Sequence, residues 1–174
     1  MLKKHLEYLV CPKCEVGLTI LEETASDNIR IKSGKLQCPK CKTSYEITNN
    51  IPRFVPANNY ANNFGLEWGI HSKTQYDSYS GTNLSEKRFF EETKWNRNLR
   101  GQIILEAGSG SGRFTEHAAT TEAMIVSMDY SDAVEANYAS NGNKENVLIV
   151  QGDIYAMPFK KSSFDKLLCI GVLQ

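Results

Sequence analysis

In the C-terminal half of this 174-residue chain, short runs of apolar residues alternate with segments in which apolar residues recur at helical spacing. Four short apolar runs, rich in β-branched residues, are separated by segments with helical spacing. Runs of this length are typical of buried strands. The predicted strands comprise residues 103–106, 124–129, 146–151 and 164–170. Strands that alternate with helices predict an α/β fold with a parallel, doubly wound sheet.

The helical segments carry candidate start signals. Ser131 stands before residues 132–139 and Ser85 before residues 86–95, and serine is a preferred N-cap residue. We therefore expect each serine to cap the helix that follows it. A further helix is expected to begin near Gly112, directly after the first predicted strand and its loop.

Two Cys-x-x-Cys pairs lie in the N-terminal quarter, Cys11 with Cys14 and Cys38 with Cys41. Four thiolates at this spacing favour a tetrahedral zinc site, because each pair presents two sulfurs together. The alternative is two disulfides in a secreted domain. The N-terminal residues do not resemble a signal peptide, so zinc is the preferred interpretation.

Short alternating stretches between the cysteine pairs, at residues 18–21 and 29–31, predict strands of a small β zinc ribbon. Ser33-Gly34 is expected to form a turn between strands. A core of this size is expected to need the metal for stability. We therefore assign residues 1–56 to a zinc-ribbon domain.

Residues 57–100 are interpreted as a linker and helical cap, beginning with an Asn-rich boundary at residues 57–63. The aromatic residues of this segment are expected either to line a pocket or to pack into the core. His71 is a weak candidate for a general base. The alternative is an exposed loop histidine.

A glycine-rich loop follows the first predicted strand, with Gly108, Gly110 and Gly112 at alternate positions. Such a loop lets a ligand approach the backbone closely. Arg113 stands where a dinucleotide-binding loop has its last glycine, and the loop lacks the lysine of a Walker phosphate loop. The spacing therefore favours a nucleoside ligand without a pyrophosphate.

Carboxylates follow the next two predicted strands. Asp129 ends the second strand, where an acidic residue can accept hydrogen bonds from ribose hydroxyls. It could also cap the following helix. Asp153 follows Gly152 after the third strand and could be only a turn residue. Glu106, at the end of the first strand, could be only a loop residue.

Together these residues resemble the first four motifs of class I S-adenosylmethionine-dependent methyltransferases, most closely the group called type 11. The resemblance covers about residues 101–174, which are assigned to the N-terminal half of such a domain. It implies that the glycine loop holds the methionine part of the cofactor, Asp129 the ribose and Asp153 the adenine amine. The implied cofactor-binding residues are Glu106, Gly108, Ser109, Gly110, Gly112, Asp129, Tyr130, Gly152, Asp153, Ile154 and Gly171.

The resemblance also implies a partial sheet with the strand order 3-2-1-4. The family has seven strands and four are counted here, so we expect the chain to be truncated after the fourth. The fourth strand would be an unprotected apolar edge, covered by a partner chain, for example in a homodimer. A soluble monomer in size-exclusion chromatography would contradict that expectation.

Residues 38–54 resemble the small zinc-ribbon proteins that activate certain RNA and translation-factor methyltransferases. This resemblance implies a structural role for the zinc ion. A catalytic role is not expected, because four thiolates leave no open coordination position.

Charge excludes few functions. The chain is neutral, with 20 basic and 20 acidic residues. Residues 1–56 have nine basic and six acidic residues, a net charge of +3, which is weaker than a nucleic-acid-binding stripe. We expect a cytoplasmic enzyme that methylates a small molecule and has no membrane span. The alternatives are an RNA methyltransferase, or a non-catalytic cofactor-binding fragment with a zinc-ribbon interaction module.

Overall fold

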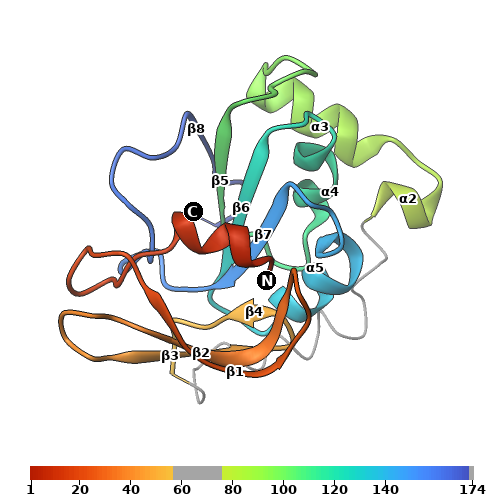
Figure 1. Ribbon diagram of the computed structural model, residues 1–174. Helices are drawn as coiled ribbons and strands as arrows, with labels where there is room; N and C mark the ends of the chain where they lie inside the picture. Colours follow the sequence, from red (N-terminus) through yellow and green to blue (C-terminus); the bar gives the residue numbers. More distant parts are fainter. Residues whose placement is uncertain (57–75, 173–174) are drawn as a thin grey trace.

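The computed structural model describes residues 1–56 and 76–172, which form two sheets packed on one another (Figure 1). The N-terminal sheet is antiparallel with the order β1-β2-β3-β4. Its strands are β1 Thr19–Ser26, β2 Ile31–Gln37, β3 Ser44–Thr48 and β4 Ile51–Pro52. A 3-10 helix, Lys3–Tyr8, precedes it. We call residues 1–56 the ribbon.

The second sheet is parallel and has the order β7-β6-β5-β8. Its strands are β5 Ile103–Ala107, β6 Met124–Asp129, β7 Val147–Gln151 and β8 Lys166–Leu168. In chain order this is 3-2-1-4, which confirms the predicted fold class and strand order. All four predicted strands are present, and β8 is shorter than the predicted run.

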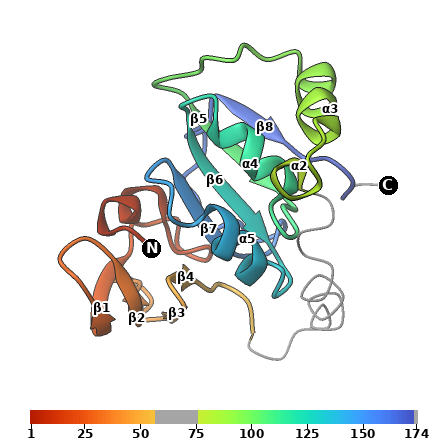
Figure 2. The same cartoon turned by 90° about the vertical axis from the view of Figure 1, so that its right-hand side faces the viewer.

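Four α-helices are described, and they lie on one face of the parallel sheet, while the ribbon covers the opposite face (Figure 2). They are α2 Asp77–Ser80, α3 Leu84–Thr93, α4 Arg113–Ala119 and α5 Val134–Asn141. None of the helices in the described ranges has the length and apolar character that a bilayer span requires.

Alternate residues of each parallel strand face opposite layers, as strand geometry requires. Leu105, Val126 and Leu148 belong to a buried cluster that also contains Ile31 and Leu36 of the ribbon. The sheet and the ribbon therefore share one hydrophobic core.

The other face of the sheet packs on the helices. Ile104, Ile125 and Ile149 join a second cluster with Phe89 of α3 and Val134 of α5. Because both faces are covered, β7 is buried at all five positions. This explains why its sequence is a continuous apolar run rather than an alternating one.

Backbone contacts also join the ribbon to the parallel sheet. The Val10 N–H donates to the Pro158 carbonyl oxygen at 2.9 Å, and the Phe54 N–H donates to the Gln151 carbonyl oxygen at 2.8 Å. Arg53 forms a parallel bridge with Gln151 at the end of β7. The chain after β4 thus continues the parallel sheet beyond its β7 edge.

The predicted turn at Ser33-Gly34 is wrong, because both residues lie inside β2. The β1–β2 turn is made instead around Asp27, whose side chain accepts hydrogen bonds from the N–H groups of Ile29 and Arg30. A side-chain acceptor of this kind stabilises a turn without glycine.

Both predicted serine caps are also wrong. Helix α3 begins at Leu84, so Ser85 lies within it, and the carboxylate of Asp77 accepts the N–H groups of Ser85 and Glu86. Helix α5 begins at Val134, two residues later than predicted. The residue at the N-cap is Ala133, and the Ser131 hydroxyl lies before it, where it donates to Asp129 and accepts the Ala133 N–H at 3.3 Å.

Strand β8 pairs with β5 and, within the described residues, with no other strand. Its central residue, Leu167, is 58% exposed. The fourth strand is therefore an edge, although only three residues long. Whether a partner chain covers it stays a prediction.

Candidate cofactor pocket and metal centre

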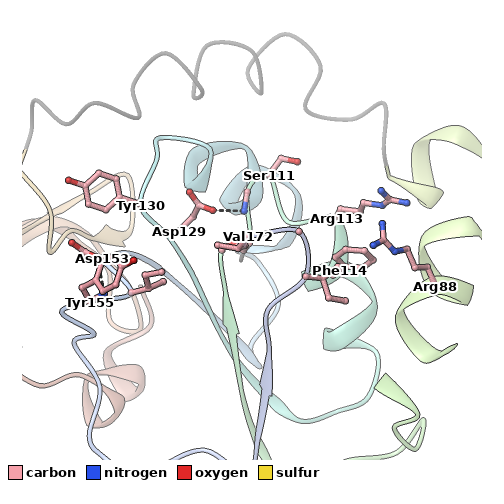
Figure 3. A pocket seen from close by; sticks show the side chains of 15 residues that line it. Arg88, Ser111, Arg113, Phe114, Asp129, Tyr130, Asp153, Tyr155 and Val172 are labelled. Carbon is pink, nitrogen blue, oxygen red and sulfur yellow. Dashed lines mark hydrogen bonds between the residues drawn. The ribbon is translucent and has the colours of Figure 1, made fainter. Parts of the chain in front are cut away.

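A pocket of about 800 Å³ lies at the carboxyl ends of the parallel strands, where α/β sheets bind ligands (Figure 3). The loops after β5, β6, β7 and β8 all contribute to it. Its lining residues are Arg88, Gly108, Ser109, Gly110, Ser111, Arg113, Phe114, Asp129, Tyr130, Asp153, Ile154, Tyr155, Ile170, Gly171 and Val172.

The glycine loop is held by backbone hydrogen bonds to the neighbouring strand. The N–H groups of Gly108 and Ser109 both donate to the Met128 carbonyl oxygen, at 2.8 and 3.0 Å. Gly108 has φ +77°, and a Cβ at this position would lie 2.1 Å from Cγ2 of Val172. Only glycine allows the loop after β5 and the loop after β8 to approach this closely.

Asp129 anchors the same loop through its side chain. Its Oδ2 accepts the Gly110 N–H at 2.7 Å, and its Oδ1 accepts both the N–H and the hydroxyl of Ser131, at 2.8 and 2.7 Å. The carboxylate also lines the pocket. It therefore joins the loop after β5 to the loop after β6 while one edge faces the cavity.

Asp153 lies at the same end of the pocket as Tyr130 and Tyr155 (Figure 3). Its Oδ1 accepts the Tyr155 N–H at 2.8 Å, so it does form the turn that was the alternative interpretation. It also lines the cavity together with Ile154. The Tyr155 side chain is 91% exposed at the rim.

Glu106 is buried below the glycine loop and is not among the residues that line the pocket. Its Oε2 accepts hydrogen bonds from the Thr115 hydroxyl and, at 2.9 Å, from the Ser127 hydroxyl. Burial raises the pKa of this carboxyl to about 7, and the nearby Asp129 charge acts in the same direction. Its position indicates support of the loop from beneath.

Gly112 and Gly152 also lie behind the pocket surface. A Cβ on Gly112, which has φ +95°, would lie 2.1 Å from Oδ1 of Asn137. A Cβ on Gly152 would lie 2.7 Å from Sδ of Met128. These glycines are explained by packing alone, and any contact with a cofactor stays a prediction.

Eight of the eleven predicted cofactor residues thus line one pocket, and Glu106, Gly112 and Gly152 do not. His71, the predicted boundary at residues 57–63, Phe64 and Trp68 lie outside the described residues. Of the other aromatic residues near this boundary, Tyr76 is buried and its hydroxyl donates to the Ser111 carbonyl oxygen, whereas Tyr79 is 68% exposed, and neither lines the pocket. Seven lining residues were not predicted as site residues. They are Arg88, Ser111, Arg113, Phe114, Tyr155, Ile170 and Val172.

The four predicted metal ligands come together in the ribbon. The Sγ atoms of Cys11, Cys14, Cys38 and Cys41 all lie within 4.8 Å of one another, and those of Cys11 and Cys41 are 3.8 Å apart. A tetrahedral zinc ion with Zn–S bonds of about 2.3 Å requires about this separation. All five cysteines of the chain are free thiols, so the geometry fits zinc and not disulfides.

Hydrogen bonds are made to the sulfur atoms of two of the four predicted metal ligands. The Tyr45 hydroxyl lies 3.2 Å from Sγ of Cys11. Hydrogen bonding to the side chain and backbone of Thr43 lowers the pKa of Cys41 to about 6. The hydrogen bond to Cys41 raises the pKa of Cys14 in turn, so the four close thiols share their protons and Cys41 is the one most readily present as the thiolate that binds a metal.

A chain of contacts connects the ribbon to the pocket wall. Nη1 of Arg53 donates to Oε1 of Gln151 at 2.5 Å, and the Gln151 amide donates to the Tyr130 carbonyl oxygen at 3.1 Å. The Arg53 guanidinium also pairs with Glu135 of α5. The loop that carries Tyr130 is therefore braced from the ribbon.

Comparisons with known families find one match in the region of the parallel sheet and one in the ribbon. Residues 105–174 match the family model described as a methyltransferase domain. Residues 3–50 match the model described as a Trm112p-like protein. A search of curated proteins finds no match.

Two solved structures are similar to this chain. A candidate S-adenosyl-L-methionine-dependent methyltransferase from Methanococcus maripaludis is 19% identical with a TM-score of 0.49, over 68% of this chain and 53% of its own. Phosphoethanolamine N-methyltransferase 1 of Haemonchus contortus, solved with phosphoethanolamine and S-adenosylhomocysteine, is 20% identical with a TM-score of 0.47. That match covers 62% of this chain and 24% of its own.

The matched part of this chain thus spans about half the length of the first structure and about a quarter of the length of the second. The two family matches coincide with the two sheets that the fold displays. The chain therefore combines a Trm112p-like zinc-ribbon region with a methyltransferase-domain region of Rossmann-like fold.

Proposed function

We propose that this protein binds S-adenosylmethionine and transfers its methyl group to a small-molecule acceptor. One observation carries the proposal. A glycine loop and the carboxylates of Asp129 and Asp153 surround one pocket at the carboxyl ends of parallel strands. The match of residues 105–174 to a methyltransferase domain supports the same function.

The lining residues fit the parts of such a cofactor. Asp129, at the end of β6, is placed to accept hydrogen bonds from ribose hydroxyls. Tyr130 and Ile154 are suitable walls for the adenine ring, and Asp153 is a suitable acceptor for its amino group. The glycine loop leaves room for the methionine portion against the backbone.

When bound, the cofactor supplies a methyl group on a sulfonium, which is a good leaving group in an in-line displacement. The protein then needs mainly to align the two reactants and to exclude water. The lining residues that position ligands are the Asp129 carboxylate and the glycine-loop backbone. No general base is assigned among the described residues, and His71 stays a weak candidate.

The acceptor is proposed to be a small molecule because the pocket volume of about 800 Å³ is within the range of small-molecule sites. The weak positive charge of the ribbon does not favour RNA. Zinc is proposed to have a structural role, since four thiolates would leave no open coordination position.

Isothermal titration calorimetry of the zinc-loaded chain with S-adenosylhomocysteine tests cofactor binding. We expect saturable binding with one site per chain. Absence of binding by a folded chain, with its fold verified by circular dichroism, would refute the cofactor assignment.

A methyl-transfer assay with labelled S-adenosylmethionine then separates the alternatives. Transfer to small molecules supports the proposal. Transfer to RNA, with substrate binding that weakens steeply as salt increases, would favour the RNA alternative. Binding of the cofactor without transfer to either class would favour the non-catalytic module.

A further inference from the structure

A buried side-chain amide on α5 lies behind the glycine loop. It belongs to Asn137, which is 0% exposed and is not among the residues that line the pocket. Its Nδ2 donates to the hydroxyl oxygens of Ser109, Thr115 and Ser127, at 3.2, 3.1 and 2.9 Å. One amide group therefore contacts the loop after β5, helix α4 and strand β6.

The orientation of this amide is fixed by Asn141, one helical turn further along α5. Nδ2 of Asn141 donates to Oδ1 of Asn137 at 3.0 Å, so Oδ1 is the acceptor and Nδ2 of Asn137 is the donor. Nδ2 of Asn141 also donates to the Gly112 carbonyl oxygen at 3.2 Å. Residues four apart lie on the same side of a helix, and both asparagines here contact the glycine loop.

The hydroxyl hydrogens of this network can be assigned, because each hydroxyl has a single hydrogen. Those of Thr115 and Ser127 donate to Oε2 of Glu106. Both oxygens can therefore only accept from Asn137. The Ser109 oxygen accepts from Asn137 as well, but its own hydrogen has no acceptor among the residues that the structure describes.

The remaining acceptor for the Ser109 hydroxyl can come from a ligand. Ser109 lines the pocket, whereas the amide of Asn137 approaches its oxygen from behind the loop. A hydroxyl that accepts from one side directs its hydrogen away from that donor. The glycine loop is assigned to the methionine portion of the proposed cofactor, and the oxygens of that portion all belong to its carboxylate.

We infer that Asn137 is a positioning residue, which turns the Ser109 hydroxyl into a donor for the carboxylate of the bound cofactor. Asn141 fixes the amide of Asn137, and the amide in turn fixes the hydroxyl. The inference rests on the proposed function. It assigns to α5 a contribution to cofactor affinity, although neither asparagine lines the pocket.

The test compares two ligands by calorimetry on the zinc-loaded chain. S-adenosylhomocysteine contains the amino-acid part, and 5′-methylthioadenosine lacks it. Ser109→Ala should weaken S-adenosylhomocysteine binding about tenfold, as expected for loss of one hydrogen bond to a charged group. Asn137→Ala should weaken it about fivefold, because the hydroxyl remains but is no longer oriented. Affinity for 5′-methylthioadenosine should change less than twofold in both variants.

The double variant tests whether Asn137 acts through Ser109. Once the hydroxyl is absent, removal of the amide should cause no further loss, so the double variant should bind S-adenosylhomocysteine as Ser109→Ala does. Asn143→Ala is the matched control, because Asn143 is exposed just beyond α5 and does not line the pocket. It should bind both ligands as the wild type does.

Thermal melting checks that each variant is folded. Ser109→Ala keeps the test decisive if Asn137→Ala does not fold, since unchanged affinity of Ser109→Ala for S-adenosylhomocysteine would overturn the inference. Equal weakening of both ligands by Asn137→Ala would also overturn it, because that result indicates only structural support of the loop. Additive losses in the double variant would do the same. Failure of the wild type to bind S-adenosylhomocysteine would instead refute the proposed function.

Discussion

Replacement of Glu106 by glutamine should change how the stability of the protein depends on pH. Burial raises the pKa of Glu106 from 4.5 to about 7, against the opposing effect of hydrogen bonds from Thr115 and Ser127. Between these two pH values the unfolded chain has released the proton and the folded chain still holds it. Stability attributable to this group therefore falls as the pH rises from 4.5 to 7.

The size of the effect follows from the shift. At about 1.4 kcal/mol for each pKa unit, the folded wild type loses about 3 kcal/mol across this window. Glutamine cannot ionise, and its amide oxygen can accept the same two hydroxyl hydrogen bonds. Glu106→Gln should therefore match the wild type near pH 5 and exceed its stability by up to about 3 kcal/mol at pH 8.

Urea denaturation from pH 5 to 8 measures this difference. Other titrating groups, including the zinc ligands, act equally in both proteins and cancel in the comparison. Glu91→Gln on the exposed face of α3 is the control and should run parallel to the wild type. If Glu106→Gln also ran parallel to the wild type, Glu106 would be ionised in the folded protein. The variant should bind S-adenosylhomocysteine within threefold of the wild type, because Glu106 does not line the pocket.

Three further predictions concern the pocket and the metal. Asp129→Asn should weaken S-adenosylhomocysteine binding at least tenfold in calorimetry, because the amide cannot accept every bond of the carboxylate, and unchanged affinity would contradict the assigned role. Gly112→Ala should lower the free energy of unfolding by about 3 kcal/mol in urea, and Gly101→Ala, with φ +83° in open space, by about 1 kcal/mol; equal losses would show that contact with Asn137 costs nothing. Zinc removal by a chelator should lower the melting temperature of the whole chain in a single transition, and a separate unchanged transition for the parallel sheet would contradict the shared core.

The sequence predicted the features that depend on neighbouring residues. β6 has its predicted bounds because its apolar run ends at Asp129, and the glycine loop lies where the strand-to-helix spacing requires. The metal centre was also predictable from neighbouring residues, because two short Cys-x-x-Cys motifs supply all four of its ligands. Parallel pairing followed from the alternation of strands and helices, and the strand order 3-2-1-4 followed from the resemblance to a known family.

Features that depend on distant residues were missed. The cap of α3 comes from Asp77, seven residues before the helix begins, and no local rule chooses it over Ser85. The role of Glu106 depends on burial below Thr115 and Ser127, which a sequence does not display. Arg88 lies on an amphipathic helix among other charged residues, and only the fold brings it to the pocket.

The shared core has a consequence for the order in which the molecule can assemble. The metal ligands lie within one stretch, Cys11 to Cys41, so the zinc centre can form early in synthesis. The contacts of Leu9 with Phe159 and of Val10 with Pro158 join residues about 150 positions apart. Such non-local contacts are slow to form and require the chain to have been synthesised at least as far as residue 159. The ribbon therefore presents uncovered apolar surface until the parallel sheet folds onto it.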